Sequence, residues 1–217
     1  MENHRVKRRP IRARDTKWAA AVAQWLTRSG LKPNQISILS IVCAALAGAC
    51  LLLAPTQGVA IKIALLVGAA VFIQLRLLCN LFDGMVAVES GFQTKSGEIY
   101  NELPDRFSDV IVLVCAGYSI PSDWVRDLGW AAGALAVITA YVRTLGASAG
   151  TSQHFCGPMA KQQRMMTIMA ASLIGVVETI TNRPPRVMIF ALGIVVTGCV
   201  ITIVRRTNRI VKELESR

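Results

Sequence analysis

The side chains of this sequence that could do chemistry are concentrated in one acidic segment. Six of the 13 Asp and Glu residues lie between Asp83 and Asp109. Asn80 and Asp83 are three residues apart and Asn101 and Asp105 are four apart, so the members of each pair share one face of a helix. Carboxylate and amide oxygens are hard ligands, which suit Mg²⁺ or Mn²⁺ rather than zinc. The segment therefore predicts an oxygen-lined site for a divalent cation.

Small residues lie on the same helix faces as these polar side chains. Gly84, Ala87 and Gly97 remove bulk there, which would let a phosphate-bearing ligand approach the backbone. Mg²⁺ commonly combines one or two protein carboxylates with phosphate oxygens of a substrate. The alternative is a polar helix pair that packs only for structure, against which stands the cost of carboxylates without partners inside a membrane span.

The elements that must position these residues are apolar helices long enough to cross a membrane. Hydrophobic residues make up 53% of the 217 residues and charged residues only 17%, which excludes an ordinary soluble globule. A helix needs about 20 mostly apolar residues to cross a bilayer. The uncharged runs predict an all-α integral membrane bundle of six transmembrane helices, near residues 36–55, 61–82, 98–119, 126–147, 164–181 and 186–205.

The distribution of basic residues predicts the orientation of these spans. The net charge is +11, yet the loops and flanks on one side hold only Lys62, Arg126, Arg183 and Arg186. The other 20 Lys and Arg residues lie at the termini or toward the opposite side. By the positive-inside rule both termini, and the acidic segment with them, face the cytosol.

The segment before the first span predicts an arm that binds the membrane surface. Six of the ten residues from 5 to 14 are basic. Trp18, Val22, Trp25 and Leu26 then recur on one helix face, and Gly30 can end that helix. Residues 1–30 therefore form a basic arm and an interfacial amphipathic helix, and residues 31–217 form the membrane domain. Beside such a helix, anionic lipid is the expected partner of the arm, and nucleic acid is not.

The stretch from Asn80 to Asp105 resembles the signature of the CDP-alcohol phosphotransferases. In that family D-x-x-D-G-x-x-A-R is followed, after eight residues, by G-x-x-x-D-x-x-x-D, and the spacing fits here at every position. Five positions match in identity, namely Asp83, Gly84, Ala87, Gly97 and Asp105. Asn80 and Asn101 stand where Asp is usual and Val88 where Arg is usual, a pattern that resembles a bacterial branch of the family.

Other parts of the chain also resemble this family. The segment Leu31–Ser37 is similar to its entry into the first span, and Tyr141–Arg143 to the end of its fourth. Gly157, followed by Lys161 and Arg164, is similar to the basic start of its fifth span. The resemblance thus covers most of the chain.

The resemblance implies a membrane enzyme of phospholipid synthesis. Such an enzyme transfers a phosphatidyl or similar group from a CDP-alcohol, usually CDP-diacylglycerol, to an alcohol acceptor and releases CMP. It implies Mg²⁺ or Mn²⁺ as cofactor, a homodimer, and a multi-pass protein of the bacterial inner membrane with its active site in the cytosol. A headgroup alcohol, a sugar phosphate and a glycerol phosphate all stay open as the acceptor.

The resemblance also implies a role for individual residues. The metal ligands are Asn80, Asp83, Asn101 and Asp105. Asp105 is in addition the catalytic general base. The residues that touch the CDP group are Asn34, Ser37, Gly84 and Thr94, and those that meet the acceptor or a lipid phosphate are Arg143, Lys161 and Arg164.

Two other functions are compatible with a polar membrane protein of this size. The first is a non-catalytic relative that binds CDP-lipid or a membrane partner, an alternative favoured by the departures at Asn80, Asn101 and Val88. The second is a transporter, but transporter sites favour the bilayer midplane and broken helices, whereas this acidic segment lies at one surface. Arg76, one turn before Asn80, is expected either to pair with Asp83 or to hold a phosphate.

Overall fold

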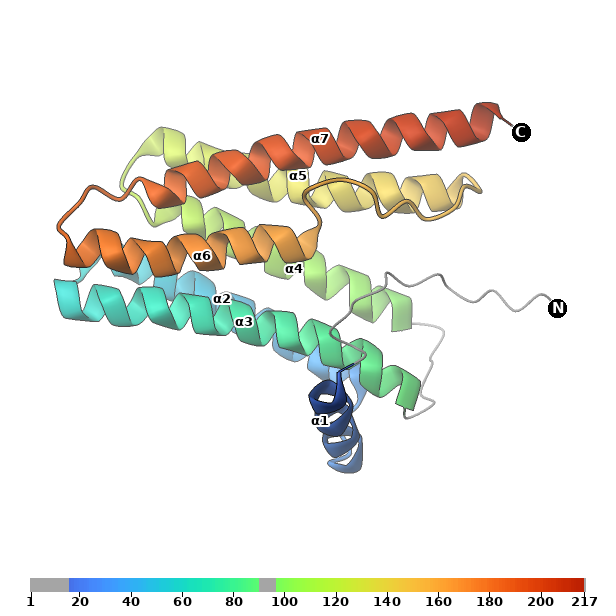
Figure 1. Ribbon diagram of the computed structural model, residues 1–217, viewed down its shortest axis with the longest axis horizontal. Coiled ribbons are helices and arrows are strands. Elements are labelled where there is room, and N and C mark those ends of the chain that lie inside the picture. Colours follow the sequence, from blue (N-terminus) through green and yellow to red (C-terminus); the bar gives the residue numbers. More distant parts are fainter. Residues whose placement is uncertain (1–15, 90–96, 217) are drawn as a thin grey trace.

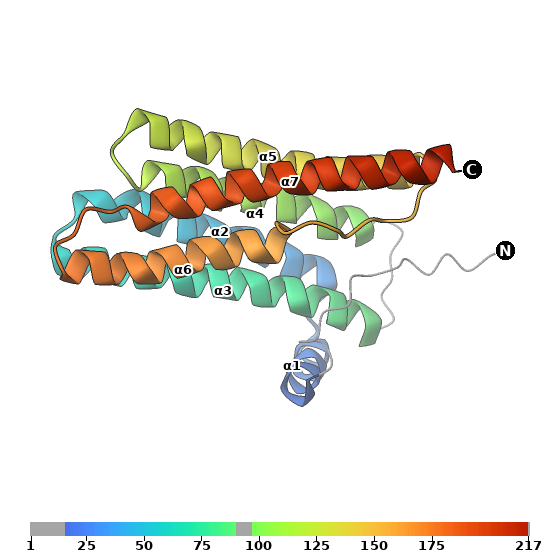
Figure 2. The same ribbon diagram turned by 45° about the horizontal axis from the view of Figure 1, so that its top comes forward.

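The chain is an all-helical bundle. The computed structural model describes residues 16–89 and 97–216, and within these ranges it contains helices and no strand. The α-helices are α1 (Lys17–Arg28), α2 (Pro33–Leu53), α3 (Val59–Glu89), α4 (Gly97–Tyr118), α5 (Asp123–Ser148), α6 (Lys161–Ile180) and α7 (Val187–Glu215). A short 3-10 helix, η2 (Ala54–Thr56), joins α2 to α3. Figures 1 and 2 show α2 to α7 running side by side along one long direction. The predicted all-α class is confirmed.

Local sequence signals explain where the first helices begin and end. Gly30 follows α1 with φ +75°, a left-handed conformation that glycine adopts without steric cost. Pro33 then opens α2 at a position where a missing N–H removes no helical hydrogen bond. The side chain of Gln35 accepts a hydrogen bond from the Lys32 backbone N–H at 3.0 Å, which closes the first turn of α2.

Small residues line the contacts between helices, and large apolar residues point outward. The buried core includes Ala44, Ala47, Ala132 and Ala136, which let neighbouring backbones approach closely. Leucine, isoleucine, valine and aromatic side chains are exposed on the outside of the bundle over α2, α3, α5, α6 and α7. An apolar surface this extensive is typical of a protein whose solvent is lipid.

Four of the described helices are long and apolar enough to cross a membrane, namely α2, α3, α5 and α7. Helix α4 is less apolar than these four because Glu102, Asp105 and Arg106 lie in its first turns. In α6 it is Lys161 and Arg164 that lower the hydropathy of the first turn. Three of the side chains predicted to form the site, Asp105, Lys161 and Arg164, are thus among those that weaken these two helices as membrane spans, and the six-span topology stays a prediction.

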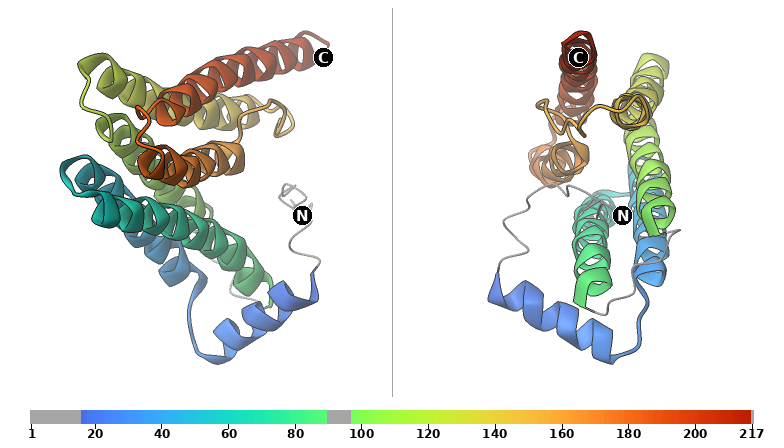
Figure 3. Two further views of the ribbon diagram at one scale, coloured as in Figure 1. Left: turned by 60° about the vertical axis from the view of Figure 1, so that its left-hand side comes forward. Right: turned by 90° about the vertical axis from the view of Figure 1, so that its right-hand side faces the viewer.

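Helix α1 covers the segment predicted to be helical before the first span. Ala19 and Ala23 are fully buried against α3, and the Trp18 ring meets Phe82 edge-on with 6.0 Å between ring centroids. Figure 3 shows α1 lying across the end of the bundle rather than along it. Trp25, on the same helix face as Trp18, is exposed.

Helices α4 and α5 cross most closely at a pair of glycines. A Cβ added to Gly129 would lie 2.8 Å from the Gly117 Cα and 3.0 Å from the Leu113 carbonyl oxygen. Both neighbours are backbone atoms, which cannot move aside as the end of a side chain could. The contact of α4 with α5 therefore requires glycine at this crossing.

We predict that Gly129→Ala lowers the stability of the bundle by about 1–3 kcal/mol, because the new methyl group forces α4 and α5 apart. Gly193→Ala is the matched control, since a Cβ at Gly193 on α7 meets nothing within 4 Å. That control should leave stability unchanged or raise it by about 0.5–1 kcal/mol through helix propensity. Thermal unfolding of the purified protein in detergent measures both, and equal effects of the two variants would contradict the close crossing.

Candidate functional site

The buried polar side chains gather at one end of the bundle, where α3 ends and α2, α4 and α6 begin. Because the helices alternate in direction, the last turns of α3 meet the first turns of the other three there. The charged and amide side chains of this region that are almost fully buried are Arg76, Asn80, Asp83, Asp105, Asp109, Arg164 and Arg206. Charged groups buried to this degree must be paired, and each has partners on another helix.

Asp105 is the most densely bonded carboxylate of the site. Its Oδ1 accepts a hydrogen bond from the Asn80 side-chain amide at 2.8 Å and one from the Arg76 guanidinium at 3.2 Å. Its Oδ2 accepts a hydrogen bond from the Lys161 ammonium. Asp105 thereby joins α4 to both α3 and α6.

Asp83 forms the other acidic part of the same cluster. Its Oδ2 accepts a hydrogen bond from the Ser37 hydroxyl of α2 at 2.9 Å. The Lys161 ammonium and the Asp105 carboxylate both interact electrostatically with Asp83. Asp83, Asp105 and Lys161 therefore form one charge cluster. We call Asp83 and Asp105 the carboxylate pair.

A second charge cluster lies one turn deeper, around Asp109. The Arg76 guanidinium donates to its Oδ1 at 2.8 Å, and the Arg164 guanidinium donates to its Oδ2 at 2.6 Å. Arg164 also donates to the Thr139 hydroxyl and to the Met159 carbonyl, both at 3.1 Å. Arg76 is the link between the clusters, because one of its nitrogens contacts both Asp105 and Asp109.

Arg206, which was not among the site residues predicted from the sequence, is buried beside this second cluster. Its guanidinium donates to the backbone carbonyls of Thr139 and Cys156. The spacing of buried residues along α7 contains a signal for it: Cys199 and Thr202 precede Arg206 at intervals of three and four residues and are fully buried. Arg206 continues that face into the polar end of the bundle.

Partly exposed charges surround the buried clusters. Glu102 pairs with Arg143 of α5 at 2.5 Å and with Arg106 at 3.4 Å. The Arg143 guanidinium also lies over the Phe155 ring, 5.4 Å from its centroid. Phe155 belongs to the loop that leads into α6, so these contacts help to place that loop.

The last turn of α7 fixes the same loop from outside the bundle. Glu213 accepts hydrogen bonds from the Ser152 backbone N–H at 2.9 Å and from the Ser152 hydroxyl at 3.0 Å. His154 lies 2.8 Å from the second oxygen of Glu213. The loop that ends at Lys161 is therefore fastened by α5 and by α7.

The structure brings together five of the side chains predicted from the sequence: Ser37, Asn80, Asp83, Asp105 and Lys161. Arg76, for which two roles were open, pairs with Asp105 and Asp109 rather than with Asp83.

The other predicted residues divide into three groups. Asn34 and Gly84 flank the site, one turn before Ser37 and directly after Asp83. Arg143 and Arg164 bond to Glu102 and Asp109. Asn101 lies in α4 but its side chain is not among those described, and Thr94 lies outside the described residues.

The donor set at the carboxylate pair fits Mg²⁺ or Mn²⁺. Asp83 and Asp105 supply two carboxylates, and the Asn80 side chain, whose amide nitrogen donates to Asp105, also carries an amide oxygen. Within residues 16–89 and 97–216, no group of three or more His, Cys, Asp or Glu side chains is arranged to hold a metal ion. A cation at this site would therefore have to take further oxygen ligands from a bound phosphate or from water.

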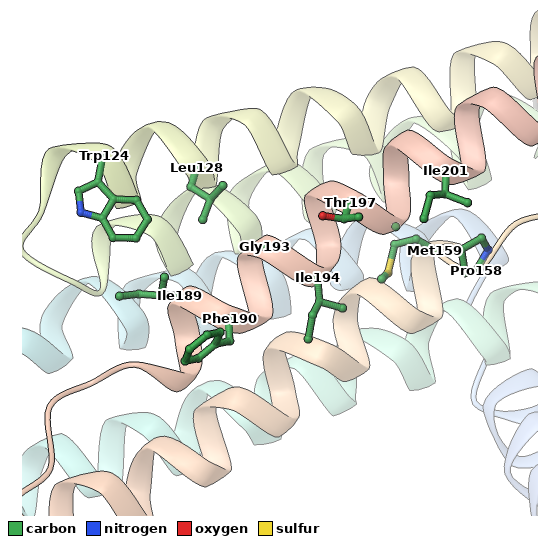
Figure 4. Close-up of a pocket in the computed structure, with 11 residues that line it drawn as sticks. Trp124, Leu128, Pro158, Met159, Ile189, Phe190, Gly193, Ile194, Thr197 and Ile201 are labelled. Atoms are coloured by element: carbon green, nitrogen blue, oxygen red, sulfur yellow. The ribbon is translucent and has the colours of Figure 1, made fainter.

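An apolar groove of the described surface is lined by side chains other than those of the charge clusters. It has a volume of about 650 Å³ and runs along α7 between α5 and the start of α6. Figure 4 shows Trp124, Phe190, Ile194 and Met159 along it. Its lining is almost wholly apolar, so it offers no ligand for a cation or a diphosphate, and the chemistry is assigned to the carboxylate pair instead.

We predict that Asp109→Asn destabilises the protein by about 3–5 kcal/mol, because it leaves the buried Arg76 and Arg164 guanidinium groups without a counter-charge. Asp123→Asn is the matched control, since Asp123 pairs with Arg126 at the same 2.6 Å but on the surface. The control should change the unfolding temperature little. If both variants unfold at the wild-type temperature, the cluster around Asp109 does not stabilise the bundle.

No family model and no curated protein matches the chain. Solved structures do match it, among them three of the phosphatidylinositol phosphate synthase of Mycobacterium tuberculosis. The complex with manganese and citrate has a TM-score of 0.71 at 21% identity and covers 88% of each chain. The complex with CDP-DAG has a TM-score of 0.72 at 20% identity and covers 90% of this chain and 94% of that one.

The third structure, the apo form of the same enzyme, has a TM-score of 0.68 at 22% identity, over 87% of this chain and 93% of that one. The match extends over nearly the whole length of both proteins. That synthase is a CDP-alcohol phosphotransferase. The resemblance that the sequence indicated is thus confirmed at the level of the fold: this chain has the fold of a CDP-alcohol phosphotransferase.

Proposed function

We propose that the protein is a CDP-alcohol phosphatidyltransferase of the membrane. It would transfer a phosphatidyl group from CDP-diacylglycerol to an alcohol and release CMP. The observation that carries the proposal is the carboxylate pair with Asn80, which lies at one end of a fold shared with an enzyme whose structures contain CDP-DAG and manganese. The identity of the alcohol is left open.

The carboxylate pair would hold the divalent cation, with Asn80 and the predicted ligand Asn101 beside it. When bound, Mg²⁺ or Mn²⁺ neutralises the charge that develops on the diphosphate. Ser37 keeps Asp83 oriented through the hydrogen bond to its Oδ2. With only two carboxylates in place, the chain relies on the nucleotide to complete the coordination, which ties catalysis to the presence of the donor.

Asp105 would remove the proton from the hydroxyl group of the acceptor. The hydroxyl oxygen then forms a bond to the phosphorus of the phosphatidyl group, and the bond from that phosphorus to the CMP oxygen breaks. CMP leaves with the bonding electrons. The Asn80 and Arg76 hydrogen bonds to Oδ1 orient this carboxylate toward the side where Lys161 enters.

The substrate-binding residues extend from this centre. We assign the CDP group to Asn34, Ser37, Gly84 and Thr94. Lys161 and Arg143, whose side chains are partly exposed, would attract an anionic acceptor or a lipid phosphate. Arg164 shares that assignment, and in the absence of ligand it is held by Asp109.

The proposal includes the placement in the membrane. Helices α2 to α7 would span the bacterial inner membrane as residues 31–217. Residues 1–30 would lie on its cytosolic surface, with Trp25 of α1 pointing into the interface. Two copies would associate as a homodimer, as the family resemblance implies.

We predict that Asp105→Asn lowers the rate of CMP release from CDP-diacylglycerol by about 10²–10⁴, because the amide keeps the shape but cannot accept the proton. The assay uses the purified chain with Mn²⁺ and a panel of alcohols, and mass spectrometry of the product identifies the acceptor. Wild-type protein that binds CDP-diacylglycerol but turns over with none of the alcohols would favour the non-catalytic alternative.

Glu102→Gln is the control for that experiment, because Glu102 lies on the same helix but pairs with Arg143 and Arg106 at the margin of the site. It should retain turnover. Loss of activity in Glu102→Gln with near wild-type activity in Asp105→Asn would mean that Glu102 is the base.

We predict that a cysteine placed at Ser216 is inaccessible to an impermeant maleimide in intact cells, whereas one placed at Arg183 reacts. Both residues are exposed, and they lie at opposite ends of the bundle, after α7 and between α6 and α7. Permeabilised cells should label both variants. The reverse pattern would place the site on the outer side of the membrane.

A further inference from the structure

The buried carboxylates Asp105 and Asp109 have cationic neighbours, but these cations differ in how firmly they are held. The Arg76 side chain is fully buried between Asp105 and Asp109. The Arg164 side chain is 2% exposed. The Lys161 side chain is 24% exposed, although the carboxylate that it contacts is 2% exposed. Lys161 is thus the one cation of these three that can leave without opening the bundle.

The oxygens of Asp109 are both used by buried guanidinium groups, so this carboxylate cannot turn toward a metal ion. Arg76 has two further nitrogens, Nε and Nη1, that are buried without a hydrogen-bond partner among the described residues. Two of the three guanidinium nitrogens therefore make no hydrogen bond within the described part of the chain, and the attraction of the positive charge to Asp105 and Asp109 is what favours this buried position. It is a permanent positive charge beside Asp105.

The other oxygen of Asp105 is in a different situation. Oδ1 is held by Arg76 and Asn80, from the same side, while Oδ2 is held by the Lys161 ammonium. The charge of Lys161 also acts on Asp83. The ammonium thus bonds to Asp105 and lies near enough to Asp83 to act on its charge, which is the region where a cation held by the two carboxylates would bind.

We propose that Lys161 is a tethered counter-ion of Asp83 and Asp105 that a single divalent cation replaces, while Arg76 supplies the second positive charge permanently. The inference rests on the proposed function for the identity of the cation. Without the metal, the ammonium keeps two buried carboxylates compensated. With the metal bound, the ammonium is released at the mouth of the site, where it can meet the anionic group of a substrate.

If a divalent cation replaces the Lys161 ammonium, two results are expected for metal binding. The side chains that the structure describes leave room for one Mn²⁺ per chain, since Asp109 bonds to two arginines and Glu102 pairs with Arg143 and Arg106. Removal of the competing ammonium should tighten that binding. A residue that only recognised the acceptor would leave the affinity for Mn²⁺ unchanged in the absence of acceptor.

The experiment is a titration of the full chain in lipid nanodiscs with Mn²⁺, in which electron paramagnetic resonance reports the free ion. We expect one ion per wild-type chain and a dissociation constant about tenfold lower in Lys161→Gln, as the loss of one charged hydrogen bond predicts. Lys161→Arg keeps the charge and should bind as the wild type does. Arg209→Gln, which removes an exposed positive charge at the same end of the bundle, controls for general electrostatics and should change the affinity little.

The possible failures can be told apart. Unchanged or weaker binding in Lys161→Gln, with binding in the wild type, would overturn the exchange and leave the proposed enzyme intact. Two magnetically coupled ions in the wild type would overturn the role of Arg76. No Mn²⁺ binding by any of the variants, with CDP-diacylglycerol present, would overturn both this inference and the metal site of the proposed function.

Discussion

Every feature of the polar end depends on one constraint: a charge inside a helix bundle must have an opposite charge within reach. Asp109 meets it with two guanidinium groups, and Asp105 meets it with a guanidinium and an ammonium. These pairs tie α3 and α6 to α4 by directional bonds rather than by apolar packing alone. The same bonds fix the rotation of each helix about its own axis. The same ion pairs therefore determine both the geometry of the candidate site and the packing of these helices.

The sequence could predict the helices and the acidic half of the site because both are periodic. Apolar runs predict α2, α3, α5 and α7 directly, and the spacing of Asn80, Asp83 and Asp105 places these residues on facing surfaces. Helices α3 and α7 continue past the spans predicted at 61–82 and 186–205, through charged turns to Glu89 and Glu215. Charge marks where a membrane span stops being apolar and not where the helix ends.

The basic half of the site was harder to predict, because the partner of a long side chain depends on how helices are placed relative to one another. Nothing in the spacing of Arg76 distinguishes Asp83 on its own helix from Asp105 and Asp109 on the next. Arg206 lies in a run of basic residues that is typical of a membrane boundary, and only its register with Thr202 hints at burial. The partners of Arg76 and Arg206 follow from the packing of α3 against α4 and of α5 against α7.

Helix α7 has a consequence for the behaviour of the protein in different membranes. Its 29 residues give a length of about 44 Å, which exceeds the hydrocarbon thickness of about 30 Å. Glu213, in its last turn, and Arg143 of α5 fasten the loop that delivers Lys161, so this loop is anchored to protein rather than to headgroups. A thinner or thicker bilayer changes how far α7 protrudes or tilts, but it does not change the distance from Glu213 to Ser152. The position of Lys161 is therefore independent of the thickness of the surrounding bilayer.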